Sequence, residues 1–205
     1  MNRATSLRIA ILAAAMLWTA TIAVAYREMR RFESTPGLPA NAPRRFPPAS
    51  ALTRGAGQWT LVMLVHPHCS CSRASVQELA QIVEKAPHTM RTYVLVYRPR
   101  GVPAGWERSE VWAAAARLRG VQVVMDQDGR EARRFGGFTS GQTFLFDGQG
   151  ALRFAGGITS LRGHAGDNRG RQDVIRIASS GTGTASHPVF GCAISSAPTG
   201  QERAR

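Results

Sequence analysis

The chain has 205 residues, which fits one ordinary domain with accessory segments and argues against a multidomain machine. With 43% hydrophobic and 19% charged residues it can fill a core, so it is not disordered throughout. The net charge of +13 comes from arginines scattered along the chain, and this scatter predicts no nucleic-acid binding, because no basic stripe or known motif is present. Anionic lipid headgroups are the better match for such a charge.

Residues 1–32 predict an N-terminal signal anchor. Within them, residues 7–25 are mostly apolar and carry no charge except Arg8, and this length is just sufficient to span a bilayer. The sequence Ala23-Val24-Ala25 also fits the small-x-small pattern of a signal-peptide cleavage site. We expect an uncleaved helix, because the apolar run is longer than that of most cleaved signals.

The segments that follow differ in composition. Residues 33–57 are rich in proline and glycine and show no apolar periodicity, which predicts a semi-extended tether that holds the domain away from the bilayer. We expect the folded domain at residues 58–182. A tail with little secondary-structure signal, residues 183–205, carries Cys192.

The domain alternates strand and helix patterns. Residues 59–65 form a continuous apolar run, typical of a strand covered on both faces in a parallel sheet. A polar turn follows, and apolar residues then recur at helical spacing over 72–85. The later expected elements are a strand at 93–97, a helix at 109–118, a strand at 121–125, a short helix at 130–135, a strand pair at 143–147 and 151–155, and a helix at 168–179. This order predicts an α/β sheet with a terminal hairpin.

An apolar strand that delivers a cysteine to the start of a helix, with a hairpin and a helix near the end, resembles the thioredoxin-like fold. The helix and strand inserted between residues 108 and 125 make the chain similar to the membrane-anchored thiol-disulfide oxidoreductases of bacterial envelopes and to the peroxiredoxins. The stretches DQDGREARRFG and TFLFD are similar to the later half of the envelope group. More narrowly, HPHCSCSRAS, GGIT, RGHAGDN and VFGC resemble a bacterial group associated with the name RedB. The resemblance covers about residues 58–180.

The resemblance implies where the protein works and on what. It implies a single-pass protein of the bacterial inner membrane whose domain faces the periplasm, and secretion after cleavage following Ala25 is the alternative. The implied partners are a protein dithiol or disulfide, as substrate, and the membrane, through the N-terminal helix. No cofactor is implied.

Two positions depart from this family. Its active site is Cys-x-x-Cys, whereas this chain has Cys69-Ser70-Cys71, and Gln142 stands where the family has a cis-proline before the hairpin. We expect Gln142 to lie across the cleft, where the proline would contact a substrate chain. We expect Cys69 to attack the partner's sulfur and Cys71 to resolve the mixed disulfide.

This chemistry requires Cys69 to be a thiolate. The N-terminus of a helix stabilises thiolate over thiol, and Arg73, or a protonated His66 or His68, would add to that effect. The alternative is a buried, inert thiol. If Cys69 and Cys71 pair, the small ring is strained, which predicts an oxidising or isomerising potential.

Two further candidates each have two alternative interpretations. Cys192 either returns to the loop as a resolving partner of Cys69 or Cys71, or remains a leftover thiol, because sequence does not give connectivity. The glycine-rich loop at 156–168 carries His164, which is a candidate proton carrier. A plain glycine-rich turn before a helix cap explains the same loop equally well.

Copper binding is the alternative function. His66, His68, Cys69 and Cys71 place four donors within six residues, and thiolates with imidazole suit copper(I). The chain would then be a carrier or assembly factor. Peroxidase activity is not favoured, because the peroxiredoxin signature has a threonine where His66 stands.

Overall fold

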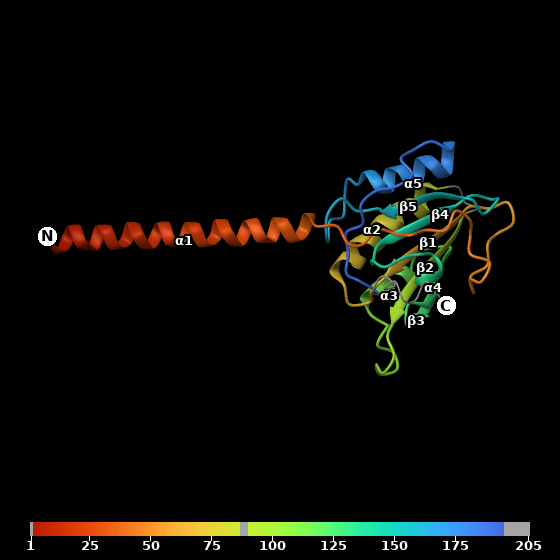
Figure 1. The fold of residues 1–205 in the computed structure, drawn as a ribbon, viewed down its shortest axis with the longest axis horizontal. Coiled ribbons are helices and arrows are strands. Elements are labelled where there is room, and N and C mark those ends of the chain that lie inside the picture. Colours follow the sequence, from red (N-terminus) through yellow and green to blue (C-terminus); the bar gives the residue numbers. More distant parts are fainter. Residues whose placement is uncertain (1, 87–89, 195–205) are drawn as a thin grey trace. The chain divides into compact units, whose positions relative to one another are not determined.

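The computed structural model describes residues 2–86 and 90–194, and the chain divides into two units, Met1–Thr35 and Pro36–Arg205. The first unit is one helix, α1 (Arg3–Ser34), which has no buried residue (Figure 1). This helix is long and apolar enough to cross a membrane, a property that signal sequences share. The predicted apolar N-terminal helix is therefore present.

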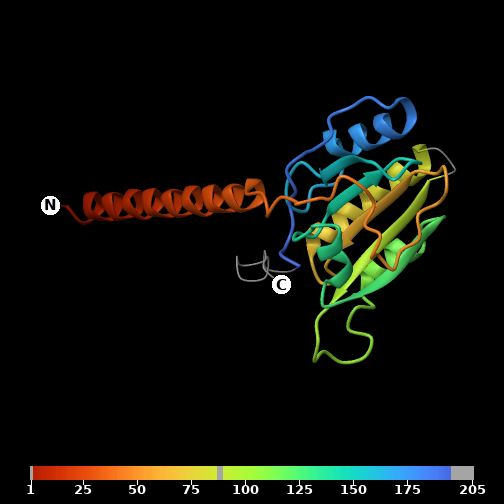
Figure 2. The same ribbon diagram turned by 45° about the vertical axis from the view of Figure 1, so that its right-hand side comes forward.

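The second unit is built around a mixed sheet of five strands (Figure 2). The strands are β1 (Thr60–Val65), β2 (Arg91–Arg98), β3 (Val121–Gln127), β4 (Gln142–Phe146) and β5 (Leu152–Gly157). Their spatial order is β3-β2-β1-β4-β5. The first three strands run parallel, β4 is antiparallel to β1, and β5 is antiparallel to β4. The fully buried β1 lies in the centre, as its unbroken apolar run predicts.

Helices cover both faces of this sheet. They are α2 (Ser70–Lys85), α3 (Glu110–Ala116), α4 (Arg130–Arg134) and α5 (Arg169–Ser180). Alternate residues of β1 serve the two faces: Leu61, Met63 and Val65 join the core beneath α2, α3 and α5, and Val62 and Leu64 join the core on the α4 side. The predicted thioredoxin-like fold, with α3 and β3 as the inserted helix and strand, is confirmed.

The proline-rich segment differs from the expectation of a tether. Its residues 36–57 pack on the domain, and the ring of Phe46 lies edge-on to Phe135 and Phe146, with centroids 5.3 Å from each. The reason is that α4 is too short to cover its face of the sheet, so apolar surface remains for the segment to bury. The expectation of a free spacer is therefore wrong for residues 36–57.

The C-terminal tail also packs on the domain as far as it is described. The backbone N–H of Ala155 in β5 donates to the carbonyl of Ala185 at 2.9 Å, and that of Gly157 donates to His187 at 3.2 Å. The tail then continues from the edge of the sheet towards the loop that precedes β4. The part of the predicted tail at 195–205 lies outside the described residues.

Candidate functional site

Cys69 lies at the point where β1 gives way to α2. The backbone N–H of His66 donates to Ser72 Oγ at 3.0 Å, which ties the turn to the first turn of the helix. Cys69 is the residue that precedes α2, and only 5% of its surface is exposed. This is the carboxyl edge of the parallel strands, where open α/β sheets place their sites. The prediction that β1 delivers Cys69 to a helix start is therefore confirmed.

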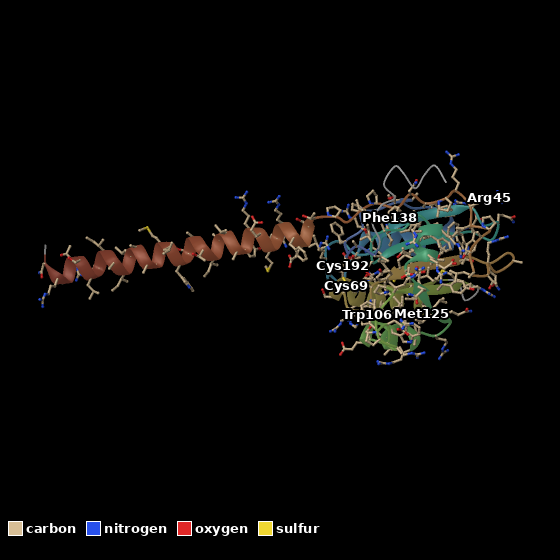
Figure 3. All side chains as sticks on the ribbon, turned by 60° about the horizontal axis from the view of Figure 1, so that its bottom comes forward. Arg45, Cys69, Trp106, Met125, Phe138 and Cys192 are labelled. Carbon is tan, nitrogen blue, oxygen red and sulfur yellow. The ribbon has the colours of Figure 1, made fainter. Side chains whose placement is uncertain are left out.

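Cys192 meets Cys69 from the other end of the sequence. The two sulfur atoms are 2.6 Å apart, and Figure 3 shows the two labelled residues side by side. Ser140, in the loop before β4, holds this approach: its hydroxyl lies 3.7 Å from Cys69 Sγ and accepts a hydrogen bond from the backbone N–H of Cys192 at 2.9 Å. The tail thus brings Cys192 back to the loop, which was one of the two alternatives open from sequence.

The surroundings of Cys69 favour its thiolate. Hydrogen bonding from the Cys71 thiol has the largest effect on the pKa of Cys69 and lowers it, whereas burial raises it. The Cys192 thiol, the Ser72 backbone amide and the Ser140 hydroxyl lower this pKa further. Together they lower the pKa of Cys69 to about 3. Donors converging on a sulfur at a helix N-terminus are the usual cause of such a shift. The surroundings therefore favour the charged form of this sulfur.

The two neighbouring thiols shift in the opposite direction. Donation to Cys69, burial and the negative charge of Cys69 all raise the pKa of Cys71. Burial, together with the same hydrogen bond and charge, raises the pKa of Cys192 to about 11, although the guanidinium of Arg162 opposes this shift. The same contacts thus favour the negative charge on Cys69 and disfavour it on Cys71 and Cys192.

Arg73 and Gln142 are not placed as expected. The guanidinium of Arg73 forms an ion pair with Glu110 at 2.5 Å, and both side chains are exposed. Arg73 thus pairs with Glu110 and not with the Cys69 sulfur. Gln142 is fully buried, and its Oε1 accepts hydrogen bonds from the backbone N–H groups of Phe138 at 2.7 Å and Thr139 at 3.1 Å. The expectation that Gln142 lies across the cleft is wrong, because the alternation of β4 turns its side chain to the α4 face of the sheet.

The two histidines before Cys69 form part of an aromatic group. His68 stacks edge-on against Trp106 with ring centroids 4.5 Å apart, and its Nε2 lies 2.9 Å from the carbonyl oxygen of Trp106. His66 Nδ1 accepts from the backbone N–H of His68 at 3.2 Å. Burial lowers the pKa of His66 despite the attraction of Cys69, so a protonated His66 does not stabilise the thiolate near neutral pH.

The expected copper ligands do not form a cluster. In the part of the chain that the structure describes, no three side chains of the His, Cys, Asp and Glu types lie close enough together to hold a metal ion. His66 and His68 use ring nitrogens in the contacts given above. The copper hypothesis therefore rests on the sequence pattern alone.

The glycine-rich loop approaches the cysteines, but through other residues than expected. His164 is exposed. The backbone N–H of Gly163 is directed at Cys71, and the guanidinium of Arg162 donates to the carbonyl of Gly191 at 2.5 Å. The loop thus supplies an amide and a cation at the site.

A groove adjoins Cys69 on the side of α3. Its volume is about 490 Å³, and its walls include Pro67, Cys69, Arg73 and Glu110. Cys69 thus forms part of the wall of a hollow on this side of the domain.

Three residues of the site escaped the sequence analysis. They are Ser140 and Arg162, which contact the tail, and Gly191, the tail residue that packs against Ser140. Their only signal was their position near the family's proline site, in the glycine-rich loop and in the VFGC motif. None of these positions predicts a contact more than 25 residues away along the chain.

Two solved structures with TM-scores above 0.5 share the architecture of this chain. No family model and no curated protein matches the chain. A hypothetical protein from Sinorhizobium meliloti is similar with a TM-score of 0.57 and 17% identity, over 79% of this chain and 96% of that one. An uncharacterized conserved protein from Geobacillus kaustophilus is similar with a TM-score of 0.55 and 13% identity, over 81% of this chain and 94% of that one. A secreted Mycobacterium tuberculosis disulfide oxidoreductase has a TM-score of 0.37 and 14% identity, over 47% of this chain and 66% of that one. At these identities the similarity concerns architecture.

Proposed function

We propose that this chain is a thiol-disulfide oxidoreductase that exchanges disulfides with protein partners, with Cys69 as the attacking sulfur. The observation that carries the proposal is the surroundings of Cys69: it lies at the start of α2, and three side chains and a backbone amide favour its thiolate. The thiolate is the form of cysteine that attacks a disulfide.

The exchange conserves atoms and electrons. The Cys69 thiolate attacks one sulfur of the partner's disulfide, a bond forms between them, and the partner's second sulfur leaves as a thiolate that takes up a proton. A second thiol of the chain then loses its proton and attacks Cys69, which releases the partner's first sulfur. Two electrons pass from the chain to the partner, and the reverse sequence oxidises a partner dithiol.

Cys192 is the thiol best placed for the second step. Its sulfur is 2.6 Å from that of Cys69, and it belongs to a different segment of chain. Cys71 is separated from Cys69 by one residue, so a disulfide between them would close a small, strained ring. We therefore assign resolution to Cys192 and the stabilisation of the thiolate to Cys71.

The exchange reaction itself tests the proposal. The reduced full-length chain in detergent is mixed with a peptide that contains one disulfide, and thiols are trapped by acid at intervals. We expect reduction of the peptide, complete loss of reaction in Cys69→Ser, and accumulation of the mixed disulfide in Cys192→Ser. Ser70→Ala, an exposed neighbour, serves as the matched control. Reduction by Cys69→Ser at the original rate would overturn the proposal.

We also propose that α1 anchors the protein in the bacterial inner membrane with the domain in the periplasm. The apolar length of α1 supports the anchor, and a periplasmic domain would suit a protein that exchanges disulfides, because disulfides persist in oxidising compartments. Release after cleavage following Ala25 is the alternative, and the mass of the mature chain distinguishes the two.

A further inference from the structure

The tail pairs with the loop before β4 as an extended strand. The backbone N–H of Ser140 donates to the carbonyl of Cys192 at 2.8 Å, and that of Ile194 donates to Phe138 at 2.8 Å. Thr139 and Ala193 form an antiparallel bridge between these two bonds. Residues 138–140 thus present a short edge that binds an extended segment through its backbone, directly beside Cys69.

The fit of the tail to this edge is close. A side chain at Gly191 would collide with the carbonyl oxygen of Ser140, and its Cβ would lie 2.6 Å from Ser140 Oγ. The guanidinium of Arg162 donates to the carbonyl of Gly191 at 2.5 Å on the side of the glycine-rich loop. Gly191 is therefore fitted between two walls, and the absence of its side chain allows Cys192 to reach Cys69.

Backbone pairing of this kind recognises the shape of an extended chain more than its side chains. Cys192 also presents a sulfur to Cys69, as a partner's cysteine must. We propose that residues 191–194 are an internal substitute for the partner: they occupy the edge at 138–140, and an extended, cysteine-containing segment of the partner protein displaces them before it reacts. This inference rests on the proposed function and adds the competition between the tail and the partner for the edge at 138–140.

The competition between the tail and the partner also gives the two chemical steps an order. While the partner's segment occupies the edge, Cys192 is displaced and the mixed disulfide on Cys69 is not resolved. When the partner's segment leaves the edge, the tail returns, Cys192 attacks Cys69, and the partner's remaining sulfur departs as a thiolate. In the mixed disulfide Cys69 carries no negative charge, so one cause of the raised pKa of Cys192 is gone, whereas the guanidinium of Arg162 remains.

Gly191→Ala tests this competition, because the added methyl group removes the tail from the edge and leaves all three cysteines in place. The first probe is a labelled peptide with the sequence of residues 186–194 and serine in place of cysteine. We expect it to bind the reduced Gly191→Ala chain, detected by fluorescence anisotropy, at least about tenfold more tightly than the unaltered chain. A tenfold change in affinity corresponds to about 1.4 kcal/mol of lost free energy of binding between the tail and the edge. Thr184→Ala, an exposed position in the same tail, is the matched control.

The second measurement is the rate of mixed-disulfide formation with an extended peptide disulfide, taken on the pH plateau of each variant. We expect Gly191→Ala to form the mixed disulfide at least about tenfold faster than the unaltered chain. Cys192→Ser should react at a rate close to that of the unaltered chain, because its serine-containing tail still occupies the edge. Equal peptide affinity and equal rates in Gly191→Ala and the unaltered chain would overturn the inference.

If Gly191→Ala does not fold, as judged by circular dichroism, Arg162→Ala removes the donor to Gly191 from the other side, and the same increase is expected. A failure of the proposed function is distinguishable: Cys69 then forms no mixed disulfide in any variant. A failure of this inference alone leaves that reaction intact and insensitive to the seating of the tail.

Discussion

Replacing Cys71 by alanine tests what keeps Cys69 ionised. Hydrogen bonding from the Cys71 thiol is the largest influence on the lowered pKa of Cys69, and alanine removes the donor without adding bulk. A hydrogen bond to a charged group contributes about 1.5 to 3 kcal/mol, and about 1.4 kcal/mol corresponds to one pKa unit. We therefore expect the pKa of Cys69 to rise by about 1 to 2 units in Cys71→Ala.

The assay is the rate of alkylation of Cys69 by iodoacetamide as a function of pH, with the site of modification assigned by mass spectrometry. Only the thiolate reacts, so the midpoint of the profile reports the pKa. Cys71→Ser keeps a donor and should restore most of the shift, whereas Ser70→Ala should leave the profile unchanged. An unchanged midpoint in Cys71→Ala, or identical midpoints for the alanine and serine variants, would refute the assignment of Cys71 as the principal donor.

Three further predictions concern the rest of the chain. Phe46→Ala should lower the free energy of unfolding by about 1 to 3 kcal/mol in urea titrations, because the ring packs on the domain; a free spacer would show no change. Burial opposes the negative charge of Asp173, but hydrogen bonds from His187 and Arg176 outweigh burial and lower the pKa of the carboxyl group. The carboxylate therefore stabilises the fold above the unfolded pKa of about 3.9, and this stabilisation is lost as the pH falls through the folded pKa. The melting temperature of Asp173→Asn should therefore fall less than that of the unaltered chain between about pH 5 and pH 3, and equal falls would contradict this. Finally, the full-length chain expressed in a bacterium should remain in the membrane fraction after alkaline carbonate with its N-terminus intact; a soluble chain that begins at Tyr26 would identify α1 as a cleaved signal.

Much of the fold is predictable from the sequence because its elements carry strong local patterns. The apolar run of β1 and the helical spacing of α2 place Cys69 at their junction without any knowledge of distant contacts. The segment at 36–57 was mistaken for a spacer because prolines dominate its composition. Whether such a segment packs depends on the apolar surface that the helices leave open, and the five-residue α4 leaves part of its face of the sheet uncovered.

The site was only half predictable for a similar reason. Cys69 and Cys71 follow from their place in one motif, but the contact between Cys69 and Cys192 joins residues 123 positions apart. It depends on a tail whose own sequence has no periodic pattern and which is ordered by backbone hydrogen bonds to β5 and to the loop at 138–140. Backbone pairing leaves little trace in side-chain identity, apart from the glycine that the close approach at Ser140 requires.

Disulfide mapping of the mildly oxidised chain tests the central assignment most directly. The reduced protein is oxidised with a small excess of a low-molecular-weight disulfide, exchange is stopped with acid, free thiols are blocked with an alkylating agent, and the digested chain is analysed by mass spectrometry. The account predicts a peptide in which Cys69 is joined to Cys192, with Cys71 recovered as a free thiol. Recovery of Cys69 joined to Cys71, with Cys192 free, would contradict it.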